Sequence, residues 1–132
     1  MSAIHCRIVT PEGIFREMDA SIINIEAEDG QQGILPEHMP LVTMLKIGRL
    51  TTEEKEGRRE YAIAGGLFYF RDNRADILTD AIESKEDIDE ERAEAARQRA
   101  EKRISSNDPN VDLKRAQIAL NKAVNRINVK SH

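Results

Sequence analysis

The stretch "EDIDEERAEAARQRAEKR", residues 86–103, decides the fold, because the hydrophobic period of the chain changes there from two to about 3.6 residues. Asp87, followed three residues later by Glu90, forms the pattern of a capping box, which predicts the start of a helix. Acids occupy the first turns of this helix and bases its last turns, as the helix macrodipole favours. The segment "SSNDPN", residues 105–110, predicts its end.

A second helix is predicted from about Val111. Its apolar positions are spaced three and four apart, at Leu113, Ala116, Leu120, Ala123 and Ile127. The first helix has a similar stripe at Ala93, Ala96, Ala100 and Ile104. Because the connection is short, the two helices are expected to be antiparallel neighbours. Residues 85–132 are therefore predicted to form an antiparallel two-helix hairpin.

The seam of this hairpin is mostly alanine, so it buries little apolar surface. At about 25 cal/mol per Å², such a seam contributes only on the order of a few kcal/mol. Two isolated helices of this length are marginal in water. We therefore expect the hairpin to need another surface or a ligand before it settles in one conformation.

Residues 1–84 are predicted to form the β part, because up to about residue 82 the hydrophobic period is two, which favours strands. The clearest runs are "AIHCRIV", "SIINIEAE", "EYAIA" and "LFYF", and "ADILTDAI", residues 75–82, is predicted to be the last strand. Turn signals separate the runs at residues 11–13, 29–30, 57, 65–66 and 72–73. Short strands with no helix between them predict an antiparallel β-sandwich or barrel.

Composition and charge indicate two parts with different partners. The chain has 132 residues, 39% apolar and 33% charged, with a net charge of −4. Residues 1–84 hold 9 bases and 15 acids, whereas residues 85–132 hold 11 bases and 9 acids, and no acid follows Asp112. The acidic total and the absence of aromatic residues from 85–132 argue against nucleic-acid binding.

No arrangement of residues indicates catalysis, a metal or a membrane span. His5, His38 and His132 are far apart, and Cys6, expected on the apolar face of a strand, is the single cysteine. The chain contains no G-x-S-x-G elbow, P-loop or dinucleotide fingerprint. No apolar run approaches the ~20 residues of a membrane helix, and the N-terminus does not resemble a signal peptide. We expect a non-enzymatic protein of a reducing, cytosolic compartment.

The most specific stretch of the β part is "GILPEHMPL", residues 33–41. Its two prolines exclude a central strand and predict a loop. We expect Leu35 and Leu41 to fill the core beneath it. The tip, formed by Glu37, His38 and Met39, is available to a partner.

Several bases of the hairpin are predicted to converge on one face. With the turn near residues 108 and 109, Arg92 lies level with Arg126, and Asp89 lies one turn from Arg92. The other bases on this side are Arg99 and Lys122. Converging cations repel one another unless an anion joins them, and arginine suits phosphate because its donors form a planar fork. The alternative is that acids such as Asp89 and Glu94 neutralise the bases as ordinary surface pairs.

Four motifs together resemble the epsilon subunit of bacterial, bacillus-type F-type ATP synthases: "VTPEG" at 9–13, "GILPEHMPL", "AGG" at 64–66 and "IDEERA" at 88–93. The resemblance covers essentially the whole chain. It implies an N-terminal β-sandwich of about ten strands and a C-terminal two-helix domain. It also implies a non-catalytic subunit of the central rotor stalk, which couples proton-driven rotation to ATP synthesis on the cytoplasmic side of the cell membrane. The sandwich would contact the gamma subunit and the ring of c subunits, with residues 37–39 facing the ring.

The resemblance also implies that ATP binds as a regulatory ligand without being hydrolysed. Some bacillus-type epsilon subunits bind ATP through a motif Ile/Leu-Asp-x-x-Arg-Ala, which here runs from Ile88 through Asp89 and Arg92 to Ala93. The flanking contacts of the family correspond to Glu83, Arg99 and Arg126. Lys122 stands where the family has an arginine, which keeps the charge but loses the fork. Adenine would rest against Ile88 and Ala93, the arginines would meet the phosphates, and the role of magnesium is left open.

By the same resemblance, the folded hairpin would hold ATP, and an extended hairpin would reach the catalytic alpha and beta subunits and inhibit ATP hydrolysis. The acid-free segment would then contact an acidic loop of the beta subunit through Lys114, Arg115, Lys122 and Arg126. The alternative is a purely mechanical stalk subunit with no nucleotide site.

Overall fold

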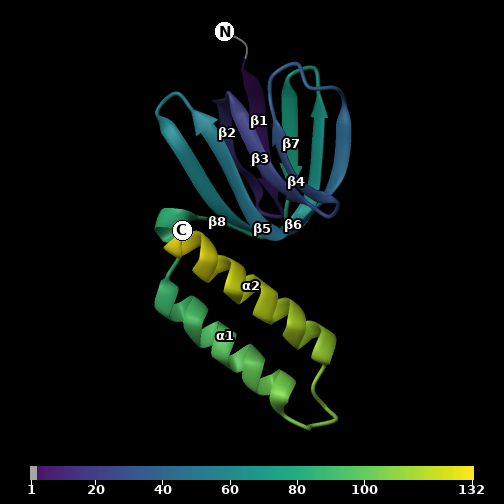
Figure 1. The fold of residues 1–132 in the computed structure, drawn as a ribbon, viewed down its shortest axis with the longest axis vertical. Helices are drawn as coiled ribbons and strands as arrows, with labels where there is room; N and C mark the ends of the chain where they lie inside the picture. Colours follow the sequence, from purple (N-terminus) through teal and green to yellow (C-terminus); the bar gives the residue numbers. More distant parts are fainter. Residues whose placement is uncertain (1–2) are drawn as a thin grey trace. The chain divides into compact units, whose positions relative to one another are not determined.

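The computed structural model describes residues 3–132, which form two compact units. The first unit ends at Ser84 and contains only strands, and the second comprises Lys85–His132 and contains the helices (Figure 1). The predicted fold class, a β-sandwich followed by a two-helix hairpin, is confirmed.

Eight strands make up the first unit: β1 (Ile4–Thr10), β2 (Gly13–Ala20), β3 (Ile22–Ala27), β4 (Gly30–Ile34), β5 (Leu41–Glu54), β6 (Gly57–Arg71), β7 (Arg74–Leu78) and β8 (Ile82–Ser84). Their order is β2-β1-β7-β6-β5-β3-β4, and β8 also pairs with β6. All pairings are antiparallel except that of β1 with β7, which is parallel. Of all the paired strands, β1 and β7 are the farthest apart along the chain, so no hairpin turn sets their relative direction.

Two long strands, β5 and β6, take part in both layers of the sandwich (Figure 1). The second half of β6 pairs with β7 through residues 67–71, and its first half pairs with β8 through residues 61–63. Counting β5 and β6 once in each layer turns eight strands into the ten that were expected. The expectation of short strands throughout was wrong, because β5 and β6 run for 14 and 15 residues and in β6 a bend replaces the predicted turn.

The bend in β6 lies at Gly65 and Gly66, which were predicted to form a turn. Their φ angles are +84° and +137°, a region that favours glycine. A Cβ atom on Gly66 would lie 1.9 Å from the carbonyl oxygen of Leu78. The "AGG" motif therefore allows two strands to approach each other closely while β6 crosses between layers.

A buried threonine interrupts the predicted last strand, residues 75–82, and divides it into β7 and β8. The Thr79 hydroxyl donates to the Gly65 carbonyl at 2.6 Å, and the Thr79 N–H donates to the Val9 carbonyl at 3.0 Å. These bonds satisfy polar groups at the bend in β6. Because their partners are distant in sequence, the alternation of apolar and polar residues within 75–82 could not reveal that the strand is interrupted at Thr79.

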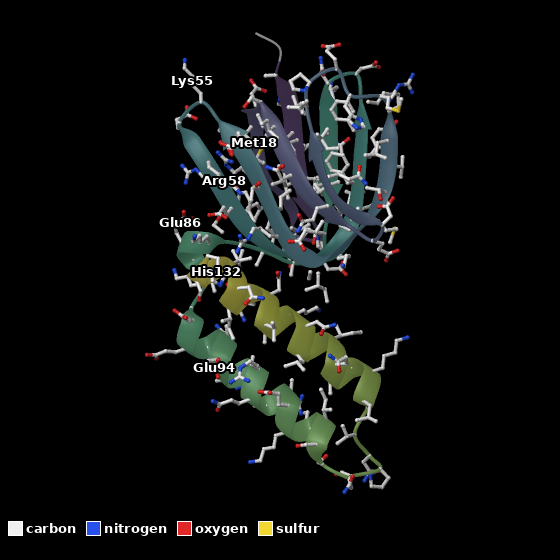
Figure 2. All side chains as sticks on the ribbon, viewed as in Figure 1. Met18, Lys55, Arg58, Glu86, Glu94 and His132 are labelled. Carbon is white, nitrogen blue, oxygen red and sulfur yellow. The ribbon has the colours of Figure 1, made fainter. Side chains whose placement is uncertain are left out.

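The core between the layers is aliphatic with two buried phenylalanines, Phe68 and Phe70. Met18, labelled in Figure 2, belongs to this core. Cys6 is fully buried on the apolar face of β1, as predicted, and burial raises the pKa of its thiol to about 12. A thiol in this state is unreactive at neutral pH.

A cluster of hydrogen bonds ties the edge strand β2 to β5 and β6. Arg16 on β2 donates to the two carboxylate oxygens of Glu54 at 2.5 and 2.6 Å and to the Tyr61 hydroxyl at 2.9 Å. The Thr52 hydroxyl also donates to Glu54, at 2.6 Å. The side chain of Glu54 is 4% exposed and that of Arg16 is 32% exposed. The Arg16 guanidinium holds the pKa of the Glu54 carboxyl below its usual value.

The helical unit consists of a 3₁₀ turn, η1 (Lys85–Asp87), and two helices, α1 (Glu90–Ser105) and α2 (Leu113–Ser131). The predicted cap, Asp87, is wrong: it lies in η1, and Asp89 caps α1 by accepting from the Arg92 N–H at 3.1 Å. Asp112 caps α2 in the same way, and α2 begins at Leu113, two residues after the expected start at about Val111. In residues 3–132, neither helix has the length and apolarity needed to cross a membrane.

The seam between the helices is built from alanines, as the spacing predicted. The buried seam residues are Ala93, Ala100, Ala116 and Ala123. Leu120 and Ile127 are half-buried, and Leu113, expected in the stripe, is exposed at the first residue of α2. A seam of methyl groups supplies little burial, so the hairpin is held weakly by its own packing.

Candidate functional site

The outer face of one layer of the sandwich carries an apolar row, defined here as Ile14, Val9, Leu78, Leu67 and Met44. These residues are direct cross-strand neighbours on β2, β1, β7, β6 and β5. Directly opposed residues project from the same face of a sheet. Ile14, Leu78 and Met44 are exposed, Leu78 by 43% of its surface.

The next row on this face is mixed. Tyr69 lies between Val42 and Asp76, and Asp76 accepts a hydrogen bond from Arg7 at 3.1 Å. The outer face is therefore apolar along one row and charged along the adjoining one. Such a contiguous apolar strip with a polar border is typical of an interaction surface.

The tip of the loop 35–40 was predicted to be Glu37, His38 and Met39, and two of these three residues are exposed. Met39 is 72% exposed and Glu37 is exposed, whereas His38 is half-buried and its ring packs edge-on against Phe70, with 5.8 Å between ring centres. Leu41 packs against the core as expected. Leu35 does not: it is 54% exposed, and the half-buried ring of His38 is the part of the loop that contacts Phe70.

The motif beginning at Ile88 forms the start of α1. Asp89 is the N-cap, and Ile88 before it and Ala93 at the fourth helical position are both buried. This spacing is that of a hydrophobic staple, which fixes how the chain enters a helix. The helix start thus accounts for three residues of the motif, and the Arg92 side chain remains available for another purpose.

The bases of the hairpin share one side, here called the basic face: Arg92, Arg99, Arg115, Lys122 and Arg126. The first four directly precede the buried alanines of the seam, Ala93, Ala100, Ala116 and Ala123. An antiparallel helix pair has approximate two-fold symmetry, so residues with the same offset from the seam lie on the same side of it. Arg126 lies one turn from Lys122, on the same side.

The register of the hairpin is tied at its open end. The Lys130 ammonium donates to the carbonyls of Lys85 and Glu86 at 3.1 and 3.4 Å. The Ser131 hydroxyl donates to the Glu90 carboxylate at 3.4 Å. These contacts place Arg126, one turn before Lys130, at about the level of Arg92.

The acids expected to neutralise the bases are mostly engaged elsewhere. Glu94, labelled in Figure 2, and Glu101 both accept from Arg97, which lies on the other side of the seam from the basic face. Asp89 accepts the backbone N–H of Arg92 rather than its guanidinium. Among residues 3–132, Arg92, Arg99 and Lys122 make no side-chain ion pair.

The remaining predicted residues lie as follows. Glu83 is half-buried in β8, in the sandwich unit, and the other predicted nucleotide-binding residues lie in the helical unit. Lys114 and Arg115 are exposed in the first turn of α2. Sequence reasoning missed Asn73, which forms hydrogen bonds with Glu37, 36 residues earlier in the chain. The only local signal for it was the turn at residues 72–73.

Known proteins match the chain along nearly its whole length. Residues 3–85 match the family model described as ATP synthase, Delta/Epsilon chain, beta-sandwich domain. Residues 86–131 match the model described as ATP synthase, Delta/Epsilon chain, long alpha-helix domain. The ATP synthase epsilon chain of Bacillus velezensis is 42% identical over 130 residues, which cover 98% of each chain. That of Desulforamulus reducens is 43% identical over 120 residues, 91% of each chain.

Solved structures show the same fold. A chain of the mitochondrial ATP synthase of Euglena gracilis, in a structure of OSCP, F1 and the c-ring, superimposes with a TM-score of 0.86 at 25% identity. The superposition covers 100% of this chain and 83% of that one. Two domain models, full-length relatives and a shared fold agree, and the chain therefore belongs to the epsilon-chain family of ATP synthases.

Proposed function

We propose that this chain is a non-catalytic subunit of the central rotor stalk of an F-type ATP synthase, where it helps to couple proton-driven rotation to ATP synthesis. Its family and its similarity to a chain in the Euglena F1 and c-ring structure support this role. In this proposal the complex lies at the cytoplasmic side of a bacterial membrane. The sandwich contacts the gamma subunit and the c ring, and the helical unit reaches the alpha and beta subunits.

The apolar row is the observation that carries the stalk role. A row of five apolar residues across five strands is costly to leave in water, and a partner that covers it gains about 25 cal/mol per Å² of apolar area. In the proposal the gamma subunit covers this row. The tip of the loop 35–40 meets the c ring.

Substitution on the row tests the docking. Leu78→Glu is expected to fold, because Leu78 is exposed, and to lose binding to an ATP synthase complex from which the epsilon chain has been removed. The control is Gln31→Glu, which adds the same charge at an exposed position on β4. Equal binding of both variants and the unsubstituted chain would remove the row from the interface.

The basic face supports a regulatory anion site. Arg92 and Arg99 offer two planar forks without an ion-pair partner among residues 3–132, and Lys122 adds a compact charge. Bound ATP supplies a chain of phosphates that neutralises these cations. The residues fit the phosphates better than the adenine, because Ile88 is 3% exposed and Ala93 is fully buried.

In the regulatory proposal ATP selects between two forms of the hairpin. The folded form holds ATP on the basic face, and an extended form brings Lys114, Arg115, Lys122 and Arg126 against an acidic loop of the catalytic beta subunit and inhibits hydrolysis. A ligand shifts such an equilibrium only by its differential affinity, and a 100-fold preference supplies about 2.7 kcal/mol. The alanine seam and the contacts of Lys130 and Ser131 stabilise the folded hairpin only weakly, so a free energy of that size can shift the balance between the two forms.

The alternative is a mechanical subunit without a nucleotide site, and one observation favours it. Ile88, Asp89 and Ala93 are explained by the helix start alone, with no ligand. The two proposals differ over what the Arg92 guanidinium does.

A thermal melt of the full chain with ATP, with ADP and without nucleotide separates the two. At an ATP concentration ten times the dissociation constant, binding stabilises the folded form by about 1.4 kcal/mol. We expect ATP to raise the melting temperature of the unsubstituted chain and of Arg97→Ala, but not of Arg92→Ala. Arg97 is a matched control, since it lies on the same helix and is engaged by Glu94 and Glu101.

Two results would decide against the nucleotide site. No effect of ATP on the unsubstituted chain would favour the mechanical subunit. An undiminished effect on Arg92→Ala would place the nucleotide somewhere other than the basic face.

A further inference from the structure

Asn73 links the turn between β6 and β7 to two segments that are distant in sequence. Asp72 and Asn73 have φ angles of 51° and 60°, as the two central residues of a type I′ hairpin turn require. The Asn73 carbonyl accepts from the His5 N–H at 2.9 Å. Its side-chain amide is directed to the loop 35–40.

The contact with the loop uses both ends of the Asn73 amide. The Glu37 N–H donates to Asn73 Oδ1 at 2.6 Å, and Asn73 Nδ2 donates to Glu37 Oε1 at 2.5 Å. Asn73 therefore holds the backbone and the side chain of the same residue. A pair of bonds of this kind fixes an orientation that neither bond would fix alone.

Glu37 needs such support, because its backbone is in the left-handed region with a φ of 71°. Non-glycine residues rarely adopt this region, and Asn and Asp do so more readily than Glu because their short polar side chains can bond locally. A conformation of this kind persists where surrounding contacts determine it. Here the Asn73 amide supplies two such contacts, in addition to the turn that the His38 N–H closes on the Leu35 carbonyl.

The backbone of Glu37 sets the direction of the rest of the loop. The following residue, His38, donates its N–H to the Leu35 carbonyl at 3.2 Å and packs its ring against Phe70. Leu35, two residues before Glu37, and Met39, two residues after it, are both exposed to solvent. The tip thus presents one anchored carboxylate between two apolar side chains.

We propose that Asn73 is the positioning residue of this tip. It holds Glu37 in the left-handed conformation and thereby directs Leu35 and Met39 toward the partner of the loop. The inference rests on the proposed function, in which that partner is the c ring. The residue acts through Glu37 and need not touch the partner itself.

Amide exchange and ring binding of matched variants test the proposal. Asn73→Ala and Asp72→Ala each place alanine at a positive φ in the same turn, but only Asn73 contacts the loop. We expect Asn73→Ala to accelerate exchange of the Glu37 amide at least tenfold and to weaken binding to membranes that carry the c ring and gamma but lack the epsilon chain. Asp72→Ala should leave both unchanged.

A third variant provides rescue, and a fourth tests the docking separately. Glu37→Gly removes the strained backbone, so in combination with Asn73→Ala it should restore binding to that of Glu37→Gly alone. Equal exchange in Asn73→Ala and Asp72→Ala would overturn the positioning role. If Met39→Glu binds the ring membranes as well as the unsubstituted chain does, the loop is not the docking tip, and that part of the proposed function fails instead.

Discussion

The pair formed by Arg16 and Glu54 predicts two substitutions of unequal cost. The Glu54 carboxylate is 4% exposed, whereas the Arg16 side chain is 32% exposed and also donates to Tyr61. Removing Arg16 leaves a buried charge that keeps the hydrogen bond from Thr52 and the more distant charge of Arg59. Removing Glu54 leaves a cation that keeps Tyr61 and can reach water.

The magnitudes follow from these surroundings. Breaking a buried ion pair by deleting one member costs about 3–5 kcal/mol, and the Thr52 hydrogen bond places Arg16→Met near the lower end, at about 3 kcal/mol. Glu54→Gln loses charge-assisted hydrogen bonds but strands no buried charge, so we expect about 1 kcal/mol. The predicted difference at pH 7 is about 2 kcal/mol, with Arg16→Met the less stable.

The difference should shrink in acid. Hydrogen bonding from Arg16 lowers the pKa of Glu54, so in the unsubstituted chain this pair contributes stability above the unfolded carboxyl pKa of about 4.3, and the contribution is lost as the pH falls through the lower folded value. Without Arg16, burial is the largest remaining influence and raises the pKa of the Glu54 carboxyl, although Thr52 and Arg59 still lower it. The cost of Arg16→Met should therefore fall between pH 7 and pH 4.

Urea unfolding of the full chain, followed by the circular dichroism of the strands at both pH values, measures these costs. The double substitution Arg16→Met with Glu54→Gln should cost less than the two single costs together, because it leaves no unpaired charge. The reasoning is wrong if Glu54→Gln costs as much as Arg16→Met at pH 7.

Three further outcomes are expected. Gly66→Ala should abolish the folded sandwich in a denaturation assay, because its Cβ would lie 1.9 Å from the Leu78 oxygen. Gly57→Ala, with a φ of +130° and no atom within 4 Å of the added Cβ, should cost only about 1–2 kcal/mol, and equal losses would contradict the packing argument. Asp89→Ala should lower helicity by circular dichroism and cost the helical unit about 1 kcal/mol, and unchanged helicity would argue against its role as a cap. Cys6 should resist iodoacetamide at pH 8 until urea unfolds the chain, and rapid alkylation of the native protein would show that the strand opens.

The local sequence determined the main division of the molecule. The change of period near residue 86 and the alanine stripes follow from side chains three and four residues apart, which meet on a helix without help from the rest of the chain. The alternation that placed Cys6 in the core likewise depends only on the pleat of a strand. These features could be predicted because the residues that cause them are neighbours.

Capping was predictable in kind but not in position. Asp87 and Asp89 both precede the helical pattern, and either could accept from an N–H of the first turn. The 3₁₀ turn at residues 85–87, held at one end by Lys130 from the far end of α2, takes up Asp87 and leaves the cap to Asp89. The two local signals are equivalent, and the turn that contains Asp87 is bonded to a residue more than forty positions away.

What tertiary structure alone decided lies where distant segments meet. Gly65 and Gly66 mark a turn in any local analysis, yet they bend a continuous strand past the Leu78 carbonyl. Leu35 faces solvent while the His38 ring packs against Phe70, and Glu37 is held by Asn73, 36 residues away. The sequence records which conformations each residue tolerates, but the atoms that select among them are brought together only when the sheet closes, since pairing between strands does not depend on their spacing along the chain.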